Sequence, residues 1–375
     1  MIALAGFACG GGSNVQYAYS DDNMTTPYWK MDRIYNETIL MISENGEPAN
    51  GKLLFQPKKI LRVSDYTLKN EYKEGVDYTV DGNKLTVTEN SSIPSLTQAQ
   101  LYGENIPEDL TTFAGRNGHD KVLFTMGVGI SMRQICVSYT YDNSQYEGPK
   151  PAYSETELPK TIAKLKAGEP IKFVVNGDSV SVGGDCSGKM GVDPFTPTWG
   201  QQIANELHRY YGSEITYVNN AKGGTTTRDW GLPMADVNLI AEEPDLAVIG
   251  YGGNDGNPTA NVPREEFKQN IIQIIEYARQ GNSDCEIILM GNMQGNPDAK
   301  PTYRQEELNG ALAEIAEEQE GVIFVDIMSL HHYMLETKRY IDLSANNVNH
   351  ASDFFARCFA MMTCARLIDY DTILK

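Results

Sequence analysis

The stretch from Ile171 to Ser181, with the sequence IKFVVNGDSVS, constrains the fold more than any other part of the chain. Its apolar and β-branched residues predict a buried strand, and the turn-forming residues 176–178 end it. Ser179 therefore follows the carboxyl end of a strand. In an open α/β sheet that edge binds ligands, because the strand-to-helix loops gather there. A lone Gly-Asp-Ser also fits a turn or a helix cap, so its meaning depends on the rest of the chain.

The chain after residue 166 alternates between strand and helix patterns. We expect further strands at 215–218, 245–251, 285–290 and 321–327, and helices at 199–211, 230–243, 264–280, 304–319 and 352–368. Five strands joined by crossover helices predict the α/β class. The connections favour a right-handed, doubly wound parallel sheet in flavodoxin-like strand order.

The first 145 residues carry strand patterns without intervening helices. The expected strands are 37–43, 51–55, 60–68, 78–80, 84–88, 121–125 and 134–141, and Asp81-Gly82-Asn83 marks a hairpin turn. We predict an all-β sandwich or jelly-roll domain over 1–145, a linker over 146–165 and the α/β domain over 166–375. Four aromatic residues of the first part could stack on sugars, although burial is favoured for aromatics: Tyr17, Tyr19, Tyr28 and Trp29.

Charge and composition exclude several function classes. The chain has 375 residues and a formal net charge of −19, which argues against nucleic acid and against an anionic membrane surface as partners. It contains no run of about eighteen apolar residues, so we expect no membrane span. Its N-terminus, MIALAGFACGGGSN, only faintly matches a lipoprotein signal. We favour a cytoplasmic location, or a cell-envelope or secreted one if that segment is a signal remnant. The six cysteines are expected to be free and buried.

Three further motifs stand at or after the ends of expected strands. A glycine-rich loop occupies 219–226, with the sequence NNAKGGTT, and Gly252-Gly253-Asn254-Asp255 follows the third strand. His350 ends the sequence NNVNH before the last helix. Glycines in loops are usually turns, so each motif alone is weak. Together they converge with Ser179 on one edge of a parallel sheet.

The four motifs in this order resemble those of the SGNH, or GDSL-type, hydrolase superfamily over residues 171 to about 370. The resemblance implies that Ser179 is a nucleophile and His350 its general base. It further implies an oxyanion hole made by the backbone N–H groups of Ser179 and Gly224 and by the Asn254 side chain. An imidazole activates a hydroxyl by taking its proton, and amide donors stabilise the oxyanion. No metal or other cofactor is expected.

The sequence departs from the family at the acid that orients the histidine. The family usually places an aspartate three residues before it, where this chain has Asn347, next to Asn346. Three alternatives are a Ser–His dyad held by an asparagine or a backbone carbonyl, an acid from elsewhere such as Asp342 or Asp353, and a lost activity. We favour the dyad, because two-domain carbohydrate acetyl esterases with an N-terminal jelly roll resemble this layout and include members without the acid.

The sequence thus predicts a serine esterase that removes O-acyl groups, above all O-acetyl groups, from oligo- or polysaccharides. A lipase or thioesterase of the same superfamily is the alternative among enzymes, and a non-catalytic carbohydrate-binding protein is the alternative outside them. The oligomeric state is left open. We expect the substrate rim to include the loop 182–198, with Asp185 and Asp193, and four further residues: Asp178, Gly223, Asp255 and Trp199.

Overall fold

The computed structural model describes residues 24–374, and their second part is built on a parallel sheet. Its strands are β11 (Ile171–Gly177), β12 (Ile215–Asn219), β13 (Leu246–Gly250), β14 (Glu286–Met290) and β15 (Val322–Val325). Their order is β12-β11-β13-β14-β15, with every neighbouring pair parallel. The predicted flavodoxin-like sheet is therefore confirmed, and the carboxyl ends of its strands form a single edge.

Helices cover both faces of this sheet. One face carries α3 (Pro159–Lys166), α6 (Trp199–Tyr211) and α11 (Asp353–Leu367), and the other carries α7 (Arg264–Gly281) and α8 (Gln305–Glu318). Alternate strand residues reach the two cores: Phe173 and Val175 pack on the first side and Val174 on the second. The single helix expected at 230–243 is wrong. Two π-helical turns, η5 (Thr227–Gly231) and η6 (Asp236–Ile240), replace it, because Pro233 has no N–H with which to continue a helix.

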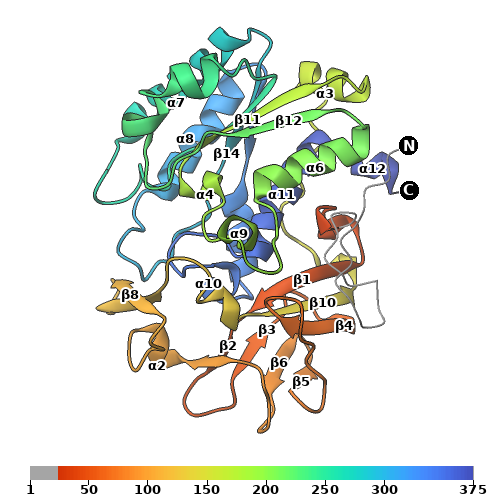
Figure 1. Ribbon diagram of the computed structural model, residues 1–375, viewed down its shortest axis with the longest axis vertical. Coiled ribbons are helices and arrows are strands. Elements are labelled where there is room, and N and C mark those ends of the chain that lie inside the picture. Colours follow the sequence, from red (N-terminus) through yellow and green to blue (C-terminus); the bar gives the residue numbers. More distant parts are fainter. Residues whose placement is uncertain (1–23, 375) are drawn as a thin grey trace.

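The first part of the described chain is all-β, as expected (Figure 1). Its strands are β1 (Arg33–Ile39), β2 (Met41–Ser43), β3 (Asn50–Lys52), β4 (Pro57–Asp65), β5 (Tyr78–Asp81), β6 (Lys84–Val87), β7 (Ser95–Thr97), β8 (Thr111–Ala114), β9 (Lys121–Phe124) and β10 (Ile135–Tyr141). They form sheets in the orders β1-β10-β4, β5-β6-β3-β2-β7 and β8-β9. The expected hairpin joins β5 to β6, and Gly82 supplies its positive φ of 59°.

The remaining helices are short, and several lie near the junction of the two parts. They are η2 (Tyr28–Lys30), α2 (Gln98–Leu101), η3 (Ser131–Arg133), η4 (Asn143–Gln145), α4 (Ser179–Val182), α5 (Ser187–Met190), α9 (Ile327–Leu335), α10 (Tyr340–Leu343) and α12 (Tyr370–Ile373). In Figure 1 the all-β part, from red to yellow-orange, lies below the α/β part, with α9 and α10 between them.

The two parts share one apolar core. Residues of β1 and β10 and residues of α9 and α11 belong to the same buried cluster, and Tyr28 and Trp29 are 0% and 3% exposed within it. Those two aromatics therefore pack in the core and do not form a sugar-binding surface. A fully buried ion pair crosses the junction, with Lys338 Nζ 2.6 Å from Glu37 Oε1. The all-β part is thus fixed against the α/β part by burial and by charge pairing.

Several sequence predictions concern residues outside the described range. Cys9, Tyr17, Tyr19 and the N-terminal glycine-rich segment belong to residues 1–23, which lie outside it. The other five cysteines are buried and free, as predicted: Cys136, Cys186, Cys285, Cys358 and Cys364. Within residues 24–374, no helix combines the length and the apolar character that a membrane crossing requires.

Candidate active site

Ser179 stands at the carboxyl edge of the parallel sheet. It is the first residue of α4, directly after β11, and the Asp178 side chain caps this helix by accepting from the Val180 N–H at 3.0 Å. The turn needs glycine before it, because a Cβ on Gly177 would lie 2.3 Å from the Gly250 carbonyl oxygen. The side chain of Ser179 is only half-buried, so it is accessible from the cleft.

His350 and Asp185 complete a hydrogen-bonded chain with this serine. His350 Nε2 lies 2.9 Å from Ser179 Oγ, and His350 Nδ1 lies 2.6 Å from Asp185 Oδ2. Both partners are buried, His350 at 8% and Asp185 at 5% exposure. A carboxylate can only accept, so Nδ1 carries the ring proton and the Nε2 lone pair faces the serine hydroxyl. A serine, a base and an acid are therefore in contact in the order that activates a hydroxyl.

The sequence predicted that an asparagine, or an acid such as Asp342 or Asp353, orients the His350 ring. This prediction is wrong, because the side chains of Asn346, Asn347, Asp342 and Asp353 all have other partners. The Asn346 side-chain oxygen accepts from the backbone N–H of Val348, Asn349 and His350, so it shapes the loop and does not hold the ring. Asn347, at φ 61°, donates its side-chain N–H to the Leu123 carbonyl oxygen.

The two aspartates considered as orienting acids, Asp342 and Asp353, instead hold backbone segments in place. Asp342 accepts from the backbone N–H of Leu40 and of Arg339, and burial raises the pKa of its carboxyl. Asp353 accepts from the N–H and the hydroxyl of Ser187 at 2.9 and 2.6 Å. It thereby anchors the loop that carries Asp185.

Sequence reasoning placed Asp185 on the rim and missed its contact with His350. Two glycines precede it: Gly183 has φ 78°, and a Cβ on Gly184 would lie 2.8 Å from His350 Cε1. Asp185 itself has φ 62°. A glycine pair followed by an acid, six residues after the serine, is the signal that could have found it, because such a turn folds the chain back toward the strand end.

The glycine-rich loop and Asn254 lie beside Ser179. A Cβ on Gly223 would be 3.6 Å from Ser179 Cβ, so this backbone faces the serine directly. Gly223 and Gly224 are exposed, and Gly224 has φ 77°. Asn254 donates one side-chain N–H to the Thr225 carbonyl oxygen at 3.0 Å, which ties it to the same loop. An amide nitrogen carries two protons, so one such bond leaves a second donor.

Three further residues expected on the rim are, like Asp185, buried instead. Asp178 is 1% exposed, and burial in particular raises the pKa of its carboxyl to about 7. Asp255 is fully buried and accepts from the N–H and hydroxyl of Thr227, and its pKa is also raised by burial. Trp199 is 1% exposed and donates its indole N–H to the Val180 carbonyl oxygen at 2.8 Å. Asp178 and Trp199 thus hold Val180, next to Ser179, whereas Asp255 holds Thr227. Gly223 is at the surface.

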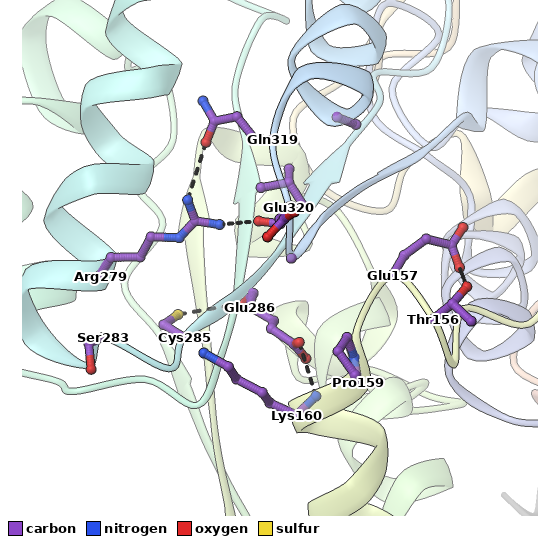
Figure 2. Close-up of a pocket in the computed structure, with 13 residues that line it drawn as sticks. Thr156, Glu157, Pro159, Lys160, Arg279, Ser283, Cys285, Glu286, Gln319 and Glu320 are labelled. Atoms are coloured by element: carbon purple, nitrogen blue, oxygen red, sulfur yellow. Dashed lines mark hydrogen bonds between the residues drawn. The ribbon is translucent and has the colours of Figure 1, made fainter.

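A small cavity of about 30 Å³ opens beside Ser179. Asn254, Asn257, Asn292 and Met293 are among its lining residues. A far larger cavity, of about 630 Å³, lies at the opposite edge of the sheet, where β14 and β15 begin. Figure 2 shows that Glu286 in this cavity points to the start of α3, where it accepts from the Lys160 N–H at 3.0 Å. The larger cavity is therefore remote from the serine.

A Ser–His–Asp chain at the carboxyl edge of a parallel sheet is the arrangement by which serine hydrolases on unrelated folds are recognised. Residues 175–353, which lie in the α/β part, match the model of the GDSL-like lipase/acylhydrolase family, so this part of the chain carries a GDSL-like hydrolase domain. The protein is accordingly a carboxylic ester hydrolase. No curated protein sequence matches the chain.

Several solved structures are similar to the chain. One is a catalytic mutant of Axe2, an acetylxylan esterase from Geobacillus stearothermophilus, with 20% identity over 55% of this chain and 98% of that one, at a TM-score of 0.45. Another is a two-domain esterase (CEX) active on acetylated mannans, with 17% identity over 61% of this chain and 57% of that one, at 0.47. A third is a lipase/acylhydrolase from Enterococcus faecalis, with 21% identity over 52% and 93%, at 0.40.

Proposed function

We propose that the protein is a serine esterase that removes O-acetyl groups from carbohydrates, with Ser179 as nucleophile, His350 as base and Asp185 as the acid that orients it. The observation that carries the proposal is the pair of contacts of 2.9 Å and 2.6 Å that join these three side chains. They support a full triad over the Ser–His dyad that the sequence favoured.

In the first half-reaction Ser179 Oγ attacks the acyl carbon while its proton passes to His350 Nε2. The imidazolium so formed keeps its proton on Nδ1 and donates it to the Asp185 carboxylate 2.6 Å away, whose negative charge stabilises the cation. The tetrahedral intermediate then collapses, and His350 returns the proton to the departing sugar oxygen. In the second half-reaction the same base activates a water, which releases acetate and restores the serine.

The intermediate's oxygen carries the developing negative charge. We assign its stabilisation to the backbone N–H groups of Ser179 and Gly224 and to the Asn254 amide. Gly223 supports this assignment, because its backbone stands against Ser179. A preorganised donor of this kind typically contributes about 3 kcal/mol to the transition state.

The size of the cavity and the charge of the chain support a small, uncharged substrate. A space of about 30 Å³ corresponds to about two water-sized groups, which suits an acetyl group better than a long acyl chain. The net charge of −19 disfavours anionic ligands. The saccharide part of the proposal follows from the sequence resemblance to two-domain carbohydrate acetyl esterases.

The test compares p-nitrophenyl acetate with the butyrate, octanoate and longer esters, with Ser179→Ala as the control variant. We expect kcat/KM to fall steeply with chain length and the control to lose several powers of ten in kcat. Mass spectrometry of acetylated xylan, mannan and pectin oligosaccharides then identifies the glycan. A maximum at the octanoyl ester or longer would indicate a lipase, and acyl-CoA turnover without ester preference would indicate a thioesterase. Wild-type activity in Ser179→Ala would refute the nucleophile assignment, and a wild type that turns over no ester above the uncatalysed background would favour the carbohydrate-binding alternative.

A further inference from the structure

The Asp185 carboxylate joins the all-β part of the chain to His350. Its Oδ1 accepts from the backbone N–H of Gly127 at 2.8 Å, while its Oδ2 lies 2.6 Å from His350 Nδ1. Gly127 lies between β9 and η3, so it belongs to the all-β part. Because Asp185 is only 5% exposed, water cannot easily replace either partner.

The conformation of Gly127 is one that a residue with a side chain rarely adopts. Its φ is 92°, and a Cβ at this position would lie 3.3 Å from Met190 Cε. Met190 ends α5, which follows Asp185 in the same loop. Glycine therefore suits this position because of its positive φ, which directs the Gly127 N–H at Asp185.

A second contact ties the same segment to the loop that carries His350. The Leu123 carbonyl oxygen, on β9, accepts from the Asn347 side-chain N–H at 3.0 Å. Asn347 stands three residues before His350, and Leu123 stands four residues before Gly127. One short segment of the all-β part thus holds both the loop of the base and the loop of the acid.

We propose that residues 123–127 are a positioning element for the acid–base pair and that the Gly127 N–H is its principal contact. This inference rests on the proposed function. The donor fixes one oxygen of the carboxylate, which leaves the other directed at His350 Nδ1. Without it the buried carboxylate loses a charge-assisted hydrogen bond and the fixed orientation of its plane. The all-β part then contributes to catalysis by completing the hydrolytic site and not only by contacting a substrate.

The test in the full chain is Gly127→Ala, with Gly75→Ala as the matched control. Gly75 also lies in the all-β part and has a positive φ of 79°, but nothing lies within 4 Å of a Cβ placed there. Both variants strain a backbone whose N–H donates a hydrogen bond, to the Tyr78 carbonyl oxygen at Gly75 and to Asp185 at Gly127, so only Gly127→Ala acts on the acid. With p-nitrophenyl acetate we expect kcat of Gly127→Ala to fall about ten- to a hundredfold at nearly constant KM, because a hydrogen bond to a charged group is lost. The control should keep wild-type kcat.

A double-mutant cycle separates positioning from a general structural effect. If Gly127 acts through Asp185, then Gly127→Ala should cause no further loss of kcat in an Asp185→Ala background. If the fold losses of kcat in the two single variants multiply in the double variant, Gly127 does not act through Asp185 and the inference is wrong. The downfield proton resonance of His350 Nδ1 gives a readout that needs no turnover: we expect it to shift or broaden in Gly127→Ala and to stay in place in Gly75→Ala.

The outcomes distinguish this inference from the function on which it rests. Wild-type activity in Ser179→Ala or Asp185→Ala would refute the proposed mechanism itself. If those two variants are inactive but Gly127→Ala matches Gly75→Ala in kcat and in the Nδ1 resonance, the triad stands and the positioning role is wrong. Circular dichroism and thermal unfolding of both glycine variants check that each remains folded.

Discussion

Replacing Asp185 by asparagine tests the assignment of the acid most directly. The variant keeps the size of the side chain and changes only its charge and hydrogen-bonding capacity. Gly127 can only donate to residue 185, so the amide oxygen of the asparagine would face Gly127. Its NH₂ group would then point at His350 Nδ1, 2.6 Å away in the wild type.

That orientation forces the histidine into the wrong tautomer. A donor opposite Nδ1 requires the ring proton on Nε2, where it faces the Ser179 hydroxyl and cannot accept its proton. The imidazolium of the transition state also loses a buried negative charge. We therefore expect kcat to fall about 10⁴-fold, as for a triad aspartate replaced by asparagine, which corresponds to about 5 kcal/mol.

The assay is kcat on p-nitrophenyl acetate at pH 8, with the fold checked by circular dichroism. Four comparison variants address the alternatives that the sequence left open: Asn346→Ala, Asn347→Ala, Asp342→Asn and Asp353→Asn. Each should affect kcat far less than Asp185→Asn, because none of these side chains holds the His350 ring. If Asp185→Asn keeps a tenth or more of wild-type kcat, the acid assignment is wrong.

Two further predictions concern pH and stability. The pKa of Asp178 is raised from 3.8 to about 7, so its contribution to stability is complete below pH 4 and is lost as the pH rises through 7. In urea titrations the free energy of unfolding of Asp178→Asn, relative to that of the wild type, should rise by up to about 4 kcal/mol between pH 4 and pH 8. The same difference between variant and wild type at both pH values would contradict this. The pKa of His331 is lowered from 6.5 to about 3 by burial, so its contribution is complete above pH 6.5 and is lost as the pH falls toward 3. His331→Phe should therefore lose less stability than wild type between pH 6.5 and pH 4, by about 3 kcal/mol; parallel curves would exclude a buried neutral histidine.

The sequence predicted the elements in which periodicity and packing agree. The helix expected at 199–211 has the bounds of α6, because its apolar face lies on the core and Gly212 ends it at φ 71°. The region 230–243 was mistaken for one helix, since its apolar spacing masked the effect of Pro233. Very short strands such as β7 and β8 were also missed. The three or four residues of these two strands carry no clear alternation of apolar and polar residues, unlike the equally short β5 and β6, which flank a recognisable hairpin turn.

Within the site, the sequence identified the residues whose positions follow from local motifs. Ser179 and His350 each stand in a recognisable loop at a strand end, and the structure brings them to 2.9 Å. Asp185 could not be found in the same way. Its place depends on two left-handed turns, at Gly183 and at Asp185 itself, and on a partner from the other part of the chain. The Gly-Gly-Asp pattern marks the turn, but it does not encode the contact with Gly127.

The asparagine at position 347 fits this architecture for a physical reason. Its side-chain N–H donates to the Leu123 carbonyl oxygen, and its own backbone carbonyl oxygen accepts from the Asn296 side chain at 2.7 Å. A carboxylate here could not donate to Leu123, and it would add a buried negative charge, besides that of Asp185, near His350. With the acid supplied by Asp185, position 347 needs a donor to bind the all-β part. The acid and the Asn347 contact with Leu123 therefore lie on two loops, and the segment 123–127 touches both.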